Sequence, residues 1–254
     1  MSHNSMELMI SVAARLLKDG STVGVGTGGP CAAAMLAQKT TAPGLVVIFE
    51  AGGIAPQMSS MPISVGDSRT FQKGLMATSM GDVFEACQRG MVDYAFLGGA
   101  QIDMFGNMNS TVIGSYEKPK VRFPGSGGAN DFASFCWNTI VMTVHNNKRF
   151  VEKVNFLTTP GYLTGPGARE KAGLPENCGP YKIITDLAVM GFDKESCRMQ
   201  VESLHPEVTL EQVQDNTGFE LLANSKIEET KPPSKTELEI LREQVDPHGY
   251  IIGR

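Results

Sequence analysis

The sequence predicts an α/β fold, with an open, mostly parallel (mixed) sheet that is covered by helices on both faces. Three observations predict it. Short, nearly continuous apolar runs alternate with helical patterns, glycine turns follow these runs directly, and a later stretch has the pattern of two adjacent strands. Strands without polar alternation are typical of parallel sheets that are buried on both faces. The 254 residues are enough for a large core, and we expect one domain over residues 1–254.

The N-terminal half supplies the first elements. Residues 1–20 have the spacing of an amphipathic helix, because Glu7 and Arg15 interrupt the apolar positions. Pro30 suits the first turn of a second helix, and a third helix is expected over residues 81–90. The apolar runs predict strands that end in glycines or a polar residue within 21–28, 44–50, 91–99 and 138–144.

The C-terminal half makes the sheet mixed. Residues 180–193 have the pattern of two strands joined by a turn at Thr185 and Asp186. Two later helix starts fit the capping box, in which Ser or Thr is followed three positions later by Glu or Gln; they are Thr209 with Gln212 and Ser234 with Glu237. Residues 223–235 are polar and contain Pro-Pro, so we expect a surface connection there.

The composition excludes several classes of protein. With 41% hydrophobic and 19% charged residues, the chain has the profile of a globular protein. A net charge of −5 and no long basic block argue against nucleic acid as a partner. The five cysteines are scattered without C-x-x-C, which favours reduced thiols in the cytoplasm over disulfides or a zinc site. No apolar run reaches the roughly 18 residues of a membrane span, and we expect neither a signal peptide nor a metal site.

Five glycine-bearing turns follow or adjoin the predicted strands. In a parallel sheet the carboxyl ends of the strands share one edge, where ligands bind. Glycine lets a ligand approach the backbone, although each turn taken alone is more often a plain tight turn. The first, GVGTGGP, has Pro30 where a dinucleotide motif needs its third glycine, which argues against a nicotinamide site. The turns lie at residues 24–30, 50–53, 98–103, 104–111 and 124–131.

Glu50 stands directly after the second apolar run. A glutamate at a strand end is most often a solvated end. The functional alternative is a covalent nucleophile, since a carboxylate is ionised at neutral pH. Gly52 and Gly53 would then leave room for an electrophile, and the N–H groups of Gly98 and Gly99 are candidates to stabilise the oxyanion.

A basic stretch precedes the last glycine turn. Lys118, Lys120 and Arg122 alternate along the chain, so a strand there would aim them at one face. They could meet phosphates or a carboxylate, or they could form an exposed basic strand edge. The residues leave both alternatives open.

Longer motifs carry a resemblance to a known family. The chain resembles the β subunit of class I coenzyme A transferases, most closely the glutaconate CoA-transferase group. The motifs cover nearly the whole chain: VGTGGP, FEAGG, FLGGAQIDMFGNMNST, KVRFPGSGGAN, TTPGYLTGPGAREKAGLP, NTGFEL and VDPHGY. The resemblance implies a CoA-transferase-like (sugar-phosphate-isomerase-like) fold.

The resemblance also implies a mechanism and a partner. Glu50 falls on the family's catalytic glutamate and Gly52 on the motif glycine, whereas Ala51 departs from the usual Ser or Asn and bears on acyl specificity. Transfer would pass through a glutamyl-CoA thioester on Glu50. Coenzyme A and acyl-CoA would be substrates, with no tightly bound cofactor. An α subunit would be the partner in an α2β2 assembly, with the active site at the α/β interface.

The glycine turns and the family motifs together give a set of candidates for contact with CoA or substrate: Gly26, Gly28, Gly52, Gly53, Gln101, Lys120, Arg122, Gly127, Gly128 and Asn130. Two alternatives to CoA transfer stay open at this stage. One is an acyl-CoA hydrolase on the same fold, and the other is a non-catalytic subunit whose partner holds the chemistry. Retention of Glu50 favours transfer.

Overall fold

The computed structural model describes residues 2–253, the side chains of Asn224 and Ser225 excepted. The chain divides into two compact units. The first consists of Met1–Phe96 with Lys231–Arg254, and the second of Leu97–Thr230. The single domain expected over the whole chain stays a prediction.

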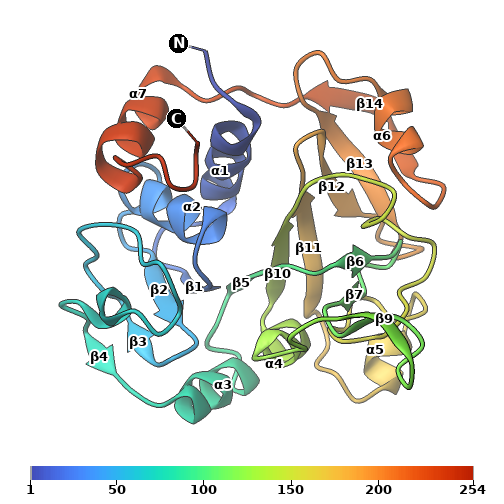
Figure 1. The fold of residues 1–254 in the computed structure, drawn as a ribbon, viewed down its shortest axis with the longest axis horizontal. Helices are drawn as coiled ribbons and strands as arrows, with labels where there is room; N and C mark the ends of the chain where they lie inside the picture. Colours follow the sequence, from blue (N-terminus) through green and yellow to red (C-terminus); the bar gives the residue numbers. More distant parts are fainter. Residues whose placement is uncertain (1, 254) are drawn as a thin grey trace. The chain divides into compact units, whose positions relative to one another are not determined.

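The first unit has a mixed sheet with the strand order β5-β1-β2-β3-β4. β1 pairs in parallel with β2 and β5, and the short β3 and β4 are antiparallel. Helices α1, α2 and α7 lie together in this unit (Figure 1). Its helices are α1 (Ser5–Leu16), α2 (Gly29–Gln38), the 3₁₀ turn η1 (Ser68–Phe71), α3 (Met80–Gln88), α7 (Lys235–Ile240) and the π-turn η2 (Leu241–Val245). Its strands are β1 (Thr22–Val25), β2 (Val46–Phe49), β3 (Gly53–Ile54), β4 (Met76–Ala77) and β5 (Tyr94–Leu97), whose last residue begins the second unit.

Local sequence explains the first helix and its packing. Asn4 and Glu7 form a capping box, so the helix begins where two backbone N–H groups gain side-chain acceptors. Ile10 and Ala13 are fully buried on its inner face. Arg242 pairs with Glu7 at 2.6 Å and so ties the C-terminal segment to the start of the chain.

The second unit has the strand order β14-β13-β12-β11-β10, with two small hairpins beside it. β10 and β11 are parallel, β11 to β13 are antiparallel, and β13 and β14 are parallel. Its helices are α4 (Ala129–Phe135), α5 (Ala168–Lys171) and α6 (Leu210–Asp215). Its strands are β6 (Gln101–Ile102), β7 (Met108–Asn109), β8 (Val112–Gly114), β9 (Pro119–Arg122), β10 (Asn138–Met142), β11 (Gly179–Ile184), β12 (Ala188–Phe192), β13 (Met199–Leu204) and β14 (Leu222–Glu229).

The structure confirms the mixed α/β class and most predicted elements. The four predicted strands are β1, β2, β5 and β10, and the three predicted helices are α1, α2 and α3. Ile183 pairs with Met190 across the expected hairpin, and both capping boxes form. No helix within residues 2–253 is long and apolar enough to cross a membrane.

One predicted connection was wrong. Residues 223–235 were expected to be a surface connection, but β14 extends to Glu229 and pairs with β13. β14 is the edge strand of its unit's sheet, because only β13 pairs with it there. An edge strand tolerates polar residues. A polar edge strand and a polar loop have the same composition, which is why the pattern did not separate them.

Candidate functional site

Glu50 and the first glycine turn follow the ends of two adjacent parallel strands, β2 and β1. Val25, the last residue of β1, lies opposite Phe49, the last residue of β2, in parallel register. Gly26 and Glu50 are the next residues of the two strands. Adjacent strands lie about 4.8 Å apart, so the two residues start from neighbouring positions at the carboxyl edge of the sheet. This is the edge at which parallel α/β sheets bind ligands.

A tight turn holds the backbone of Glu50. The N–H of Gly52 donates to the carbonyl oxygen of Phe49 at 2.9 Å, which makes Glu50 and Ala51 the two central residues of the turn. Glu50 is half-buried. The carboxylate is thus carried by a closed turn at the strand tip and not by a frayed end.

The glycines after Glu50 are packed against the chain itself. Gly52 has φ +106°, and a Cβ there would lie 1.9 Å from the carbonyl oxygen of Thr78. A Cβ on Gly53 would lie 1.9 Å from the carbonyl oxygen of Thr70. The room that these glycines were expected to leave for an electrophile is therefore filled, on the side of a side chain, by the protein's own backbone. Both are glycine because the turn is pressed between two backbone segments.

The first glycine turn does leave open space. A Cβ added to Gly26 or Gly28 would meet no atom within 4 Å. Gly28 is the N-cap of α2 with φ +81° and provides no side-chain cap, and Pro30 lies in the first helical turn as predicted. Uncapped N–H groups at the start of a helix favour a negatively charged or oxyanionic group. In this unit the open backbone lies beside the strand that carries Glu50.

The other predicted residues belong to the second unit, so their action on Glu50 stays a prediction. Gly98 is exposed, and a Cβ there would meet nothing within 4 Å. Gly99 is held more closely, since Nη1 of Arg149 donates to its carbonyl oxygen at 2.7 Å. Gln101 is buried, and its Oε1 accepts from Nδ2 of Asn109 at 2.8 Å. Gln101 therefore serves the packing of its own unit as well as being a candidate for substrate contact.

The basic stretch forms a strand for part of its length. Lys120 and Arg122 lie on β9, two positions apart and therefore on one face, whereas Lys118 precedes the strand. Both strand residues are exposed. The Arg122 guanidinium lies 4.7 Å from the ring centre of Tyr116 and donates to its carbonyl oxygen at 3.1 Å. The Arg122 side chain is therefore held within the hairpin of β8 and β9.

The motifs that carry the family resemblance converge in the second unit. Ser110 and Gly125 exchange two hydrogen bonds of 2.9 Å, which join the NST motif to the GSGG loop. Nδ2 of Asn130 donates to the carbonyl oxygen of Thr158 at 3.0 Å, which joins that loop to TTPG. Gly127 and Gly128 lie between these anchors, the latter as the N-cap of α4. Segments far apart in sequence therefore form one polar framework.

Sequence reasoning missed the centre of a second framework in this unit. Asn107 is buried, and its Oδ1 accepts from the N–H groups of Gly161 at 2.9 Å and Leu163 at 3.1 Å. Its Nδ2 donates to the carboxylate of Asp103 at 3.0 Å. Burial is the main effect on Asp103 and raises its pKa, which the hydrogen bonds from Asn107 oppose. An Asp and an Asn four residues apart around a glycine were the available signal.

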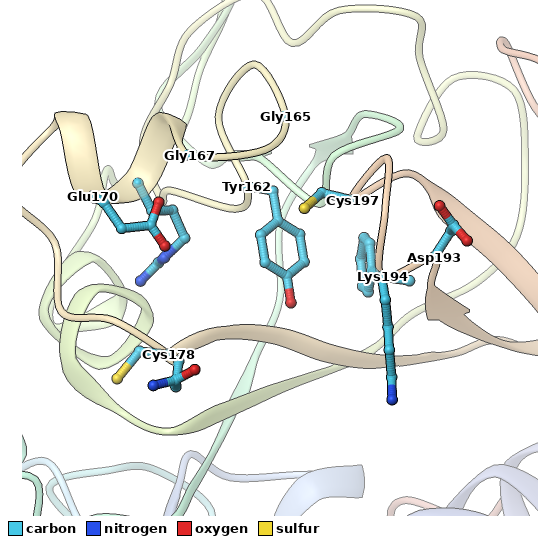
Figure 2. A pocket seen from close by; sticks show the side chains of 11 residues that line it. Tyr162, Gly165, Gly167, Glu170, Cys178, Asp193, Lys194 and Cys197 are labelled. Atoms are coloured by element: carbon cyan, nitrogen blue, oxygen red, sulfur yellow. The ribbon is translucent and has the colours of Figure 1, made fainter.

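A cavity of about 270 Å³ in the second unit contains none of the predicted site residues among its lining. Tyr162 stands in its middle, with Glu170 on one side and Asp193 on the other (Figure 2). Burial raises the pKa of the thiols of Cys178 and Cys197, so both stay protonated at neutral pH. The cavity therefore offers no activated thiolate. Among residues 2–253, no three His, Cys, Asp or Glu side chains gather as they would around a metal ion.

Comparison with known proteins identifies the family. The sequence pattern of the coenzyme A transferase family matches residues 6–216 of the chain. The chain belongs to the coenzyme A transferase family. It is 41% identical over 242 residues to the β (B) subunit of the 3-oxoadipate CoA-transferase of Pseudomonas knackmussii, a match that covers 95% of this chain and 93% of the relative.

A second relative supports the same family and subunit type. The CoA-transferase chain is 38% identical over 256 residues to the β (B) subunit of the glutaconate CoA-transferase of Acidaminococcus fermentans, which covers 99% of this chain and 96% of the relative. The crystal structure of that organism's glutaconate CoA-transferase matches with a TM-score of 0.94 at 36% identity, over 99% of this chain and 98% of the other. The chain therefore corresponds to the β subunit of class I CoA-transferases. Its relatives are subunits of two-subunit enzymes, which implies a partner subunit for this chain.

Proposed function

We propose that this subunit moves CoA between an acyl-CoA and a carboxylic acid through a covalent intermediate on Glu50. The observation that carries the proposal is the parallel register of Val25 with Phe49. This register places Glu50, the residue after Phe49, next to Gly26, the residue after Val25, whose backbone borders open space. A carboxylate nucleophile needs a fixed backbone and unobstructed space next to it. The turn closed by Gly52 and the glycine turn before α2 supply both.

The chemistry balances with carboxylates and thiolates alone. An oxygen of Glu50 attacks the donor thioester carbon, the C–S bond breaks, and CoA thiolate leaves a mixed anhydride. The thiolate then attacks the glutamyl carbonyl carbon, and the donor acid departs as a carboxylate. The acceptor carboxylate reverses these steps on the glutamyl-CoA thioester and restores Glu50. Such double displacement gives ping-pong kinetics.

The chain's own groups would stabilise the charge that moves in these steps. Each attack develops negative charge on a carbonyl oxygen, which preorganised N–H donors stabilise. Gly98 and Gly99 remain the candidates for these donors, and Lys120 with Arg122 for the phosphates of CoA. The two relatives act, by name, on 3-oxoadipate and glutaconate. We therefore expect a dicarboxylic acid as acceptor or donor, and an α subunit in an α2β2 assembly.

The test uses the protein purified with its partner subunit. It is incubated without acceptor with the acetyl, succinyl, glutaconyl and 3-oxoadipyl esters of CoA, reduced with borohydride, and digested for mass spectrometry. A reduced glutamyl adduct at Glu50 is the expected result. Glu50→Gln should abolish both adduct and transfer. Glu85→Gln is the control, because Glu85 is an exposed acid of the same unit whose contact is a surface pair with Arg89.

Two other outcomes would contradict covalent transfer on Glu50. Steady release of CoA with unmodified Glu50 would identify a hydrolase. Full transfer by the Glu50→Gln complex would place the covalent step elsewhere and refute the proposal.

A further inference from the structure

The segment between β3 and β4 packs behind the Glu50 turn. The carbonyl oxygen of Thr70 lies so close to Gly53 that a Cβ there would approach it to 1.9 Å. On the other side the N–H of Thr78 donates to the carbonyl oxygen of Gly52 at 2.9 Å. The turn that carries Glu50 is therefore held between two backbone segments. At both places backbone touches backbone directly, and no side chain lies between them.

Asp67 organises the first of these segments. Its carboxylate accepts from the N–H of Arg69 at 2.9 Å and from the N–H of Ile63 at 3.1 Å. Nε of Arg69 donates to it at 3.0 Å. The Asp67 carbonyl oxygen accepts from both the N–H and the hydroxyl of Thr70, at 2.9 and 2.7 Å. The Asp67 side chain thus caps the 3₁₀ turn η1 through Arg69 and Ile63, and the Asp67 main-chain carbonyl binds Thr70 within the same turn.

The segment is not in a relaxed conformation. Ala55 and Lys73 have φ +49°, although neither is glycine. Left-handed conformations of such residues cost free energy and tend to lie at functional sites. The two residues flank one hydrogen bond in sequence: the N–H of Leu75, two residues after Lys73, donates to the carbonyl oxygen of Ile54, the residue before Ala55, at 3.0 Å. Both conformations therefore persist because the surrounding contacts hold them.

We propose that Asp67 is a positioning residue for Glu50. Its hydrogen bonds fix the turn Ser68–Phe71, the Thr70 carbonyl of that turn presses on Gly53, and Gly53 sets the turn from which Glu50 projects. The inference rests on the proposed role of Glu50 as nucleophile. Because the two backbones are in direct contact, a displacement of the Thr70 carbonyl also displaces the Glu50 turn. A misplacement of the Glu50 carboxylate by about 1 Å slows its attack on the thioester by up to about 100-fold.

The experiment compares Asp67→Ala with Glu237→Ala in the complex with the partner subunit. Glu237 is a matched control, because its carboxylate also accepts from a backbone N–H, that of Ser234 at 2.7 Å, and pairs with an arginine, Arg15 at 2.6 Å. Both variants lose a capping acid of the same unit, so a general loss of stability affects them alike. The readouts are the rate of adduct formation at Glu50 with the four acyl-CoAs, kcat and KM.

Asp67→Ala should slow adduct formation about 10-fold to 100-fold and leave KM within about threefold. Asp67→Asn keeps one acceptor oxygen, so it can accept from the N–H of Arg69 or from that of Ile63 but not from both, because the two donate to different carboxylate oxygens. It should recover about threefold of that loss and stay at least threefold slower than the unaltered complex. Glu237→Ala should stay within about twofold of the unaltered complex.

Two results would overturn the inference. One is adduct formation at the unaltered rate in an assembled Asp67→Ala complex, and the other is an equal loss in Glu237→Ala. If Asp67→Ala does not assemble, Asp67→Asn decides, and an unaltered rate in that variant refutes the role. Activity that survives Glu50→Gln would refute the proposed function itself, whereas an inactive Glu50→Gln with a normal Asp67→Ala refutes the positioning role alone.

Discussion

The backbone of Gly52 packs so closely against Thr78 that a Cβ at residue 52 would lie 1.9 Å from the Thr78 carbonyl oxygen. The same two residues share a hydrogen bond of 2.9 Å from the N–H of Thr78 to the carbonyl oxygen of Gly52. Any side chain at residue 52 must therefore push the Glu50 turn away from Thr78, the residue that follows β4.

Gly52→Ala should destabilise the protein by roughly 2–5 kcal/mol, from the positive φ together with the overlap. It should also lower kcat, since the Glu50 turn has to move. Gly81→Ala is the control, because a Cβ on Gly81 in α3 would have its nearest atom at 3.5 Å, an ordinary contact. Urea denaturation and kcat check both variants. An unaltered kcat in a folded Gly52→Ala protein would contradict this account of the turn.

Gly26 and Gly28 should respond differently to alanine. A Cβ at Gly28 has space but needs φ +81° and ψ −145°, so Gly28→Ala should cost about 1–3 kcal/mol of folding free energy. Gly26→Ala should change stability little and instead raise KM for acyl-CoA about 10-fold, because its methyl enters the open space beside Glu50. Thermal denaturation and steady-state kinetics separate the two effects. A KM unaffected by Gly26→Ala would show that substrate does not use this space.

Asn107→Ala should destabilise the second unit by roughly 2–6 kcal/mol. The change leaves the buried N–H of Gly161 and the part-buried N–H of Leu163 without their acceptor, and each such loss costs about 1–3 kcal/mol. The exposed Asn147 provides a control of the same residue type, and Asn147→Ala should stay within about 0.5 kcal/mol. Denaturation curves of the two variants give the comparison. Equal stabilities would mean that water or a neighbour replaces the lost acceptor.

His145 should make stability depend on pH. It is 4% exposed and bonded through its two ring nitrogens to the hydroxyls of Thr185 and Thr217, and burial lowers its pKa from 6.5 to about 4. The unfolded chain therefore binds the proton first on acidification. The stabilisation is complete above about pH 6.5 and falls as the pH drops toward 4, by roughly 3 kcal/mol at most.

The measurement for this prediction is the free energy of unfolding at pH 7.0, 5.5 and 4.5. His145→Gln should flatten the slope between these values relative to the unaltered protein, because the other acids remain the same in both. A slope that is identical in the two proteins would exclude His145 as the titrating group.

Much of the local structure was available from the sequence. Apolar runs such as residues 44–50 predict strands because a strand buried on both faces admits no polar side chain. The capping pair Ser234 and Glu237 predicts a helix start from a contact within four residues. The strand β14 escaped prediction, because an edge strand keeps polar residues that also suit a loop.

The candidate site was predictable in part. Glu50 was found from its place after a strand and from the family motif. The reason for Gly52 and Gly53 was not, because it lies in the carbonyl groups of Thr70 and Thr78, much further along the chain. Asp67 carries no motif of its own. Its role depends on a turn whose neighbours in space are distant in the chain.

The sequence by itself determined the α/β class, the family and the nucleophile candidate, because periodicity, capping and motif spacing are short-range signals. Only the tertiary structure decided which glycines leave space and which are filled by backbone. It also decided that Gly26 and Glu50 start from adjacent strand ends, as the register of Val25 with Phe49 requires. Register and packing are set by the burial of whole strands against one another, and no window of neighbouring residues contains that information.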